Sequence, residues 1–156
     1  MAFALDLQKF AEKVGERADD AVGAIVIGVA AEVDKRSPVG DPTKWSEEFK
    51  RVGKELGWFG EGYVGGRFRG NWQVGVTERP NGTLPNIDPT GVETQTRIQA
   101  AIPGDASGKV YYLVNNLPYA LRLEDGYSKQ APKGMVGLTV THFQAIVKKA
   151  VEEVRA

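Results

Sequence analysis

The sequence predicts an α+β fold in a single domain, residues 1–156: a long N-terminal helix and a C-terminal helix pack on a small antiparallel sheet, with long loops between these elements. Apolar residues recur at three- and four-residue steps at both ends of the chain, which indicates amphipathic helices. Between them lie two short segments with the composition and alternation of β-strands. A chain of this length can bury a core without disulfides, and it has no cysteine.

The N-terminal helix is expected to run from Leu5 to Lys35, because an apolar stripe extends through Phe3, Leu7, Phe10, Val14, Ala18, Ala21, Ile25, Val29 and Val33. Such a helix would be about 45 Å long, whereas a compact chain of this size is about 40 Å across. The helix should therefore span or overhang its own domain, which favours a partner surface at one end. Only Glu32 is charged between Ala21 and Val33, a stretch well short of the ~20 residues that span a bilayer. This half either lies in the core of the chain or packs in part on a neighbouring subunit.

A shorter helix is expected after Ser37-Pro38, with Ser46 as its N-cap and Gly57 as its stop. Its apolar face would comprise Trp45, Phe49, Val52 and Leu56. This segment either covers the core as a lid or contacts a partner. The glycine-rich run that follows contains GEGYVG at residues 60–65, which matches a dinucleotide fingerprint literally. No strand precedes it, so a loop is the better interpretation.

The first strand is expected from the alternation of Phe68, Gly70, Trp72, Val74 and Val76 with polar residues. The second is 110–114, which should pair antiparallel with 71–77. Between them, the Pro- and Gly-rich residues 79–91 predict a long loop that either reaches a neighbour or orders only on assembly. Residues 92–102 alternate like a strand, but their composition also suits a helix.

After the second strand, Pro118 should end the extended run near Asn116, and residues 119–124 should make one or two helical turns closed by Gly126. A polar loop then leads to the C-terminal helix. Its predicted stripe is Val140, Phe143, Ile146, Val147, Ala150, Val151 and Val154, and Thr141 with Gln144 forms a possible capping box. We interpret His142 as a solvated or hydrogen-bonded side chain.

The composition excludes several kinds of site. Twenty basic and twenty acidic residues give a net charge of zero, which disfavours general attraction to nucleic acid or to an anionic membrane. One histidine and no cysteine exclude a multi-histidine zinc site and thiolate chemistry. The N-terminus lacks the pattern of a secretion signal. We expect no cofactor, no metal and no enzymatic activity.

Two ordered blocks of residues carry a resemblance. The first comprises NLPYA at 116–120, LEDGYS at 123–128 and AP at 131–132; the second comprises SPVG at 37–40 and GRFRGNW at 66–72. Together they resemble the tail-component, tail-completion or neck proteins of long-tailed bacteriophages. In that family the two parts of the second block are contiguous, so residues 41–65 are an insertion, and the acidic residue that follows the valine is displaced to Asp41.

The resemblance implies a structural virion protein of the head-to-tail junction, located at the neck or tail end and in the host cytoplasm during assembly. It implies a homo-oligomeric ring, with a hexamer favoured, that contacts connector and tail proteins, while DNA passes through its channel without sequence-specific binding. It also implies that residues 92–102 form a helix. The family-like positions are Arg67, Arg69, Trp72, Tyr119, Arg122, Glu124 and Tyr127. We expect Trp72 to anchor its strand and the other six to make loop or interface contacts.

Two alternatives remain open. Arg67, Arg69, Arg79 and Trp72 could form a nucleic-acid-binding module, which salt-dependent DNA binding would reveal. Glu124 and Asp125 could be catalytic carboxylates of a hydrolase, although adjacent carboxylates on a short loop more often cap or solvate.

Overall fold

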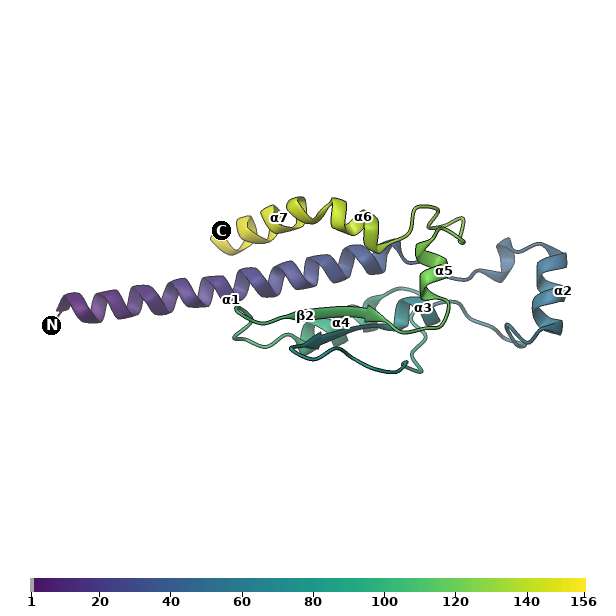
Figure 1. The fold of residues 1–156 in the computed structure, drawn as a ribbon, viewed down its shortest axis with the longest axis horizontal. Coiled ribbons are helices and arrows are strands. Elements are labelled where there is room, and N and C mark those ends of the chain that lie inside the picture. The colour runs from purple at the N-terminus through teal and green to yellow at the C-terminus, as the bar shows by residue number, and fades with distance from the viewer. Residues whose placement is uncertain (1) are drawn as a thin grey trace.

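The computed structural model describes residues 2–156, and the side chains of residues 9, 10 and 12–156. It has the predicted α+β architecture (Figure 1). The elements in order are α1 Ala2–Arg36, the 3-10 helix η1 Pro42–Lys44, α2 Glu47–Glu55, α3 Arg67–Gly70, β1 Trp72–Val76, α4 Val92–Ala101, β2 Tyr111–Asn115, α5 Ala120–Glu124, α6 Val136–Thr141 and α7 Phe143–Arg155.

Helix α1 lies between two layers: α7 runs along one side, and α4 with the two-stranded sheet covers the other (Figure 1). Ile146 of α7 packs directly on Gly28, where an added Cβ would lie 2.7 Å from the isoleucine Cγ2. On the other side, an added Cβ on Gly23 would lie 3.7 Å from Cγ2 of Ile102. The two strands pair antiparallel, with Trp72 opposite Asn115, as predicted. The core comprises Ala30, Val33, Phe68, Trp72, Ile98, Leu117, Ala131 and Met135.

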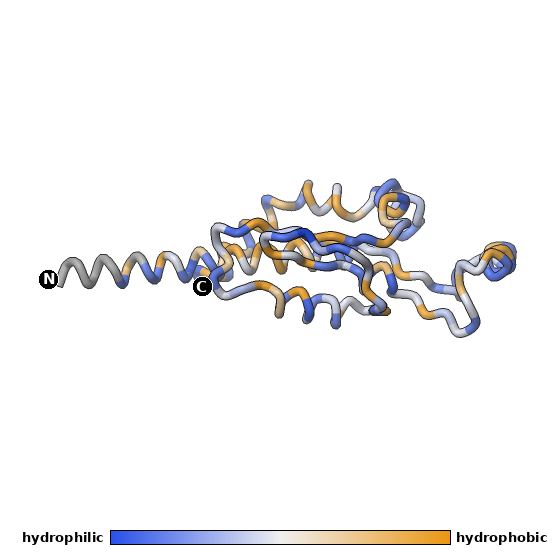
Figure 2. Tube along the Cα trace, turned by 60° about the horizontal axis from the view of Figure 1, so that its bottom comes forward, coloured by the Kyte–Doolittle hydropathy of each residue, from blue (hydrophilic) through white to orange (hydrophobic). Residues whose placement is uncertain are grey.

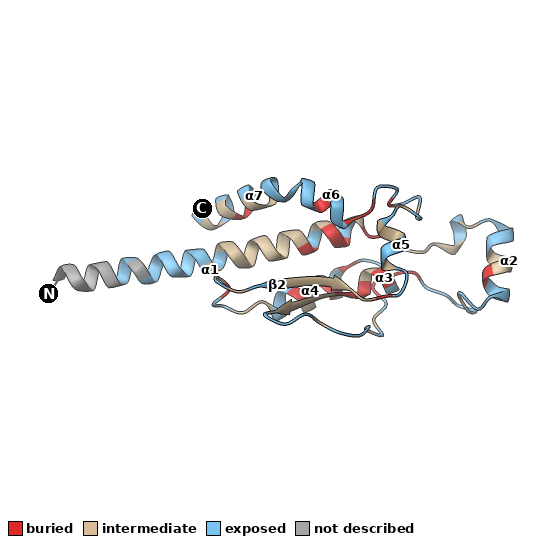
Figure 3. Cartoon of the chain, in the orientation of Figure 1, coloured by how far each residue is buried: buried red, intermediate tan, exposed pale blue. Residues whose placement is uncertain are grey.

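The first part of α1 projects beyond both layers, so the expected overhang is confirmed (Figure 3). Every described side chain from Lys9 to Ala18 is exposed. The body begins at Asp19, whose carboxylate accepts hydrogen bonds from the backbone N–H of Ser107 at 2.8 Å and from its hydroxyl. We call residues 2–18 the overhang. Phe3 and Leu7, which belong to the predicted stripe, lie outside the described side chains. No described helix is long and apolar enough to cross a membrane.

The predicted start of the first strand is wrong. Residues 67–70 form the short helix α3, and β1 begins only at Trp72. Gly66 adopts a left-handed φ of 116°, which turns the chain into the helix. The Asn71 side chain then donates to the Arg67 carbonyl at 2.8 Å and fixes the turn. Phe68 and Gly70 are buried as predicted, but on a helical turn rather than on a strand.

The C-terminal helix is divided, which the stripe did not predict. Helix α6 ends at Thr141 and α7 starts at Phe143, with His142 between them. The predicted capping box is absent, because the Thr141 hydroxyl donates to the Leu138 carbonyl at 2.6 Å inside α6. Val140 and Phe143 are exposed, so these two members of the predicted stripe do not face the core. His142 is exposed and hydrogen-bonds to the Leu138 carbonyl, as expected of a solvated histidine.

The other predicted elements are confirmed. Residues 92–101 are helical, as the resemblance implied, and the loop at 79–91 has no helix or strand of its own. Ser46 caps α2 by accepting from the Phe49 N–H at 3.1 Å. Gly126, at a φ of +87°, closes α5: its N–H donates to the Leu123 carbonyl, and the next N–H donates to the Arg122 carbonyl.

Candidate interaction surfaces

Arg69, expected to make loop or interface contacts, fastens the end of α1 to the 79–91 loop inside the subunit. Its guanidinium donates to the backbone carbonyls of Asp34 at 3.1 Å, Pro89 at 2.7 Å and Ser37 at 3.3 Å. The last carbonyls of a helix have no partner within the helix, so these bonds act as a C-terminal cap. The arginine side chain is largely buried and its donors are used within the subunit.

Two buried carboxylates lie beside this arginine. Asp34 Oδ1 is 3.7 Å from Arg69 Nε and accepts no hydrogen bond. Burial raises the pKa of Asp34 to about 6, although the positive charge of Arg69 opposes the rise. Asp88 accepts from the N–H groups of Gly91 and Thr94, at 2.9 and 2.8 Å, at the start of α4. Burial alone would raise the pKa of Asp88, but these donors lower it below its usual value.

Trp72 anchors β1, as expected. Its ring is buried, and its indole N–H donates to the Ser37 hydroxyl at 2.8 Å. That hydroxyl donates in turn to the Val33 carbonyl at 2.8 Å. The second family-like block therefore ties α1, α3 and β1 together. Of its arginines, only Arg67 points to solvent.

Glu124 is a structural residue as well. Its carboxylate accepts from the backbone N–H groups of Met135, Val136 and Gly137 at 2.9, 3.0 and 2.9 Å. These are free donors at the first turn of α6, so Glu124 caps that helix from a distance in the sequence. Burial alone would raise the pKa of Glu124, but the three donors hold it below its usual value. The neighbouring Asp125 is exposed.

The remaining family-like residues form an exposed surface around α5. The guanidinium of Arg122 lies over the Tyr127 ring at 4.8 Å from its centroid. Tyr119 is partly exposed, with its ring centroid 6.2 Å from that of Phe68. Leu121 between them is 79% exposed. The sequence prediction thus combined two kinds of residue: Arg69, Trp72 and Glu124 build the subunit, whereas the others face outward.

Residues 41–65, the insertion, form an arm at the end of the molecule opposite the overhang (Figures 1 and 2). The arm has its own aromatic cluster, in which the Trp45 ring contacts Phe49, Phe59 and Tyr63 at centroid distances of 5.2, 4.6 and 5.3 Å. The alternative of a lid over the core is wrong, because the core cluster contains no residue of the arm. Of the predicted face, Trp45 and Phe49 pack within this cluster although Phe49 stays 37% exposed, whereas Leu56 is 60% exposed.

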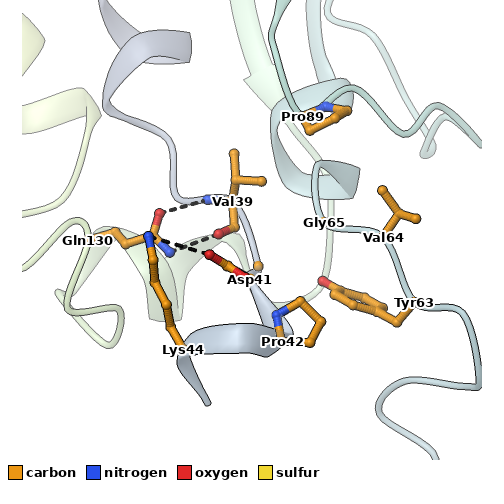
Figure 4. A pocket seen from close by; sticks show the side chains of 10 residues that line it. Val39, Asp41, Pro42, Lys44, Tyr63, Val64, Gly65, Pro89 and Gln130 are labelled. Carbon is orange, nitrogen blue, oxygen red and sulfur yellow. Dashed lines mark hydrogen bonds and ion pairs between the residues drawn. The ribbon is translucent and has the colours of Figure 1, made fainter.

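The arm joins the body where two segments meet at Gly40 and Gly65. A Cβ on Gly65 would collide with the Gly40 carbonyl oxygen, so only glycine permits this approach. Gln130 fastens one segment: its side chain accepts from the Val39 N–H at 3.1 Å and donates to the Val39 carbonyl at 2.8 Å (Figure 4).

An open depression of about 420 Å³ lies at this junction. Figure 4 shows it lined by both segments, by Gln130 and by Pro89. Its charged groups, Asp41 and Lys44, pair with each other at 3.4 Å. Among the described residues, no group of three or more histidine, aspartate or glutamate side chains is placed to hold a metal.

The four residues of the nucleic-acid alternative differ in exposure. Trp72 is buried and Arg69 is largely buried, whereas Arg67 is exposed and the Arg79 guanidinium donates to the Asn116 side chain at 3.2 Å. Sequence reasoning missed Asp34, Asp88 and Gln130; the roles of Asp34 and Gln130 depend on partners far away in the chain. Asp88 did carry a local signal, since an acidic residue shortly before a helix is a common cap.

Comparison with known proteins adds no assignment: no family model, no curated protein and no solved structure matches the chain.

Proposed function

We propose that the chain is a structural subunit of the head-to-tail junction of a long-tailed bacteriophage, where copies form a ring at the neck or tail end. The choice of this assembly rests on the resemblance of the two motif blocks to tail-completion and neck proteins. The observation that carries the proposal is the shape of the subunit: a small body extends an exposed helix from one end and an aromatic arm from the other (Figure 1).

This shape suits a subunit that meets different neighbours at its two ends. Apolar side chains are exposed on both extensions, including Phe10 and Val14 on the overhang and Leu56, Trp58 and Val64 on the arm. Exposed apolar surface of this kind commonly marks protein interfaces. The ring would use the same pair of unlike surfaces at every subunit boundary, and many modest contacts would gain strength from their number.

The role of DNA in this proposal is passive. The chain is neutral overall, and Arg69 of the motif is used within the subunit. DNA would therefore pass through the ring without being held by it. The connector and tail proteins of the virion would be the partners on either side of the ring, and the α5 surface with Tyr119, Arg122 and Tyr127 is available for them.

The test is negative-stain electron microscopy of particles from an infection in which this chain is not produced. We expect filled heads accompanied by separate tails, and joined virions when the intact chain is supplied from a plasmid. A matched control supplies a chain with Gly60→Ala, a position where an added Cβ meets no atom within 4 Å. Normal joined virions without the chain would refute the proposal.

A further inference from the structure

The long loop at 79–91 contains an asparagine followed directly by a glycine. The loop has no helix or strand of its own, and Asn81 is exposed near its start. Gly82 has a left-handed φ of +77°, and an added Cβ there would meet no atom within 4 Å. Because glycine has no side chain, nothing on residue 82 obstructs the approach of its backbone nitrogen to the Asn81 side chain.

The two groups that would react with each other are both free. Asparagine is among the thermolabile residues, because its side-chain amide can be attacked by the backbone nitrogen of the next residue. Among the described residues, the Asn81 amide has no hydrogen-bond partner and the Gly82 N–H has no acceptor. The neighbouring carbonyls are held instead: the Asn116 side chain donates to those of Pro80 and Gly82, both at 3.0 Å.

The other four asparagines of the chain are protected. All are buried or half-buried, and none precedes a glycine. Three of them use both the oxygen and the nitrogen of the side chain in hydrogen bonds: Asn71, Asn115 and Asn116. The fourth, Asn86, is half-buried and precedes Ile87, a stiff β-branched residue that crowds its own backbone nitrogen. Asn81 therefore differs from the others in both sequence and surroundings.

We propose that Asn81 is a site of spontaneous deamidation, with the backbone nitrogen of Gly82 as the nucleophile and water as the only other reactant. The Gly82 nitrogen loses its proton and attacks Cγ of Asn81. The N–Cγ bond forms, the Cγ–Nδ2 bond breaks, and the side-chain nitrogen leaves with the proton as ammonia. Water then opens the succinimide: breaking the new N–Cγ bond gives aspartate, whereas breaking the original peptide bond gives isoaspartate, whose main chain is one carbon longer.

The isoaspartate product alters the turn that Asn116 holds. An extra main-chain carbon between the carbonyls of Pro80 and Gly82 changes their separation, so one amide no longer donates to both. The Arg79 guanidinium, which donates to Asn116 at 3.2 Å, loses its position as well. The aspartate product changes little, because the Asn81 side chain has no hydrogen-bond partner to lose. Deamidation thus loosens the loop from the end of β2 through isoaspartate alone, whatever the subunit assembles with.

Incubation of the full-length chain over several weeks, at pH 7 and at pH 9, tests the site. Peptide mass spectrometry measures the conversion of amide to acid at all five asparagines. We expect conversion at Asn81 several times that at each of the others, and faster at pH 9, because the Gly82 nitrogen must lose its proton. Unfolding the chain in urea should speed the other four and leave the rate at Asn81 similar.

The matched control is Gly82→Ala, which places a methyl group beside the nucleophile at a position with open space; its fold is checked by circular dichroism, and it should convert several times more slowly. Conversion at Asn81 no faster than at Asn86 would overturn the inference, as would a native rate far below the rate in urea.

Thermal melts test the structural consequence. Fresh chain, aged chain and Asn81→Asp are compared, with equally aged Gly82→Ala as the control for other effects of ageing and with methyltransferase labelling to measure isoaspartate. We expect a lower melting temperature only in the aged chain, since Asn81→Asp has the new charge without the longer backbone. Equal melting of the fresh chain and of an aged chain rich in isoaspartate would refute the loosening of the loop.

Discussion

Replacing Arg69 by alanine should destabilise the protein more than any other single arginine change. The substitution removes a partly buried cation that bonds three backbone carbonyls and faces the Asp34 carboxylate. Removal of one partner from a buried charge pair costs about 3–5 kcal/mol. We expect a loss in that range in the free energy of unfolding at pH 8, with the unfolding still cooperative.

The loss should depend on pH because of Asp34. Its pKa is raised from 3.8 to about 6 in the folded protein, so the native state binds this proton more tightly than the unfolded state. The stabilisation contributed by protonated Asp34 is therefore full below the pKa of this group in the unfolded state, and it is lost as the pH rises through 6. A pKa shift of this size corresponds to about 3 kcal/mol in the free energy of unfolding. Without Arg69, the pKa of Asp34 should rise further, and Arg69→Ala should cost less at pH 5 than at pH 8.

Urea unfolding followed by circular dichroism at both pH values measures these quantities. Arg67→Ala is the matched control, since this arginine is exposed and surface changes usually stay within about 0.5 kcal/mol. Asp34→Asn, alone and combined with Arg69→Ala, isolates the coupling between the two residues. The reasoning fails if Arg69→Ala costs no more than Arg67→Ala, or if its cost is the same at pH 5 and pH 8.

Three further predictions concern single residues. Glu124→Gln should cost about 1–2 kcal/mol, because an amide cannot accept all three N–H donors. Since the pKa of Glu124 is lowered in the folded protein, wild type loses this advantage as the pH falls through that lowered pKa. Urea unfolding at pH 7 and at successively lower pH should therefore show the two proteins converging. Gly65→Ala should cost about 1–3 kcal/mol by forcing apart the segments at the base of the arm. Gly60→Ala, measured in the same thermal melts, should be nearly neutral. Equal melting temperatures for the two variants would contradict this account. Trp72→Phe should cost about 1–2 kcal/mol through the lost bond to Ser37, and a double-mutant cycle with Ser37→Ala that shows no coupling would refute the assigned role.

The sequence predicted best those elements whose signal is local. The stripe from Phe3 to Val33 repeats often enough to define α1 nearly to its ends. Ser46 and Gly126 were identified as caps because capping depends on residue type and short-range hydrogen bonds. The overhang was one of the two expected outcomes because the predicted helix is longer than a compact domain of this size is broad.

The errors arose where two structures share one pattern. Alternation from Phe68 to Val76 suits a strand, but only residues 72–76 are a strand in the structure, and Phe68 is buried on the helical turn that precedes them. The left-handed Gly66 and the bond from Asn71 to Arg67 decide between them, and neither shows in hydrophobic periodicity. The stripe at 140–154 likewise could not reveal that Val140 and Phe143 face away from the core.

The site prediction failed for a different reason. A motif marks residues that matter without saying whether they build the subunit or meet a partner. Arg69 and Glu124 have the charge of interface residues, yet each satisfies backbone groups of its own chain, which lie 20 to 35 residues away for Arg69 and 11 to 13 residues away for Glu124. Pairings 11 to 35 residues apart cannot be inferred from spacing in one sequence.

The meeting of Gly40 and Gly65 also bears on how the arm could arise. Since the chain leaves and re-enters the body at one point, the twenty-odd residues between can be added or deleted without displacing any core residue. Loop-closure entropy changes only slowly with length, so such an addition costs the fold little. The aromatic cluster keeps the added segment compact by itself. Related chains could thus exchange arms of different length and shape on a constant body.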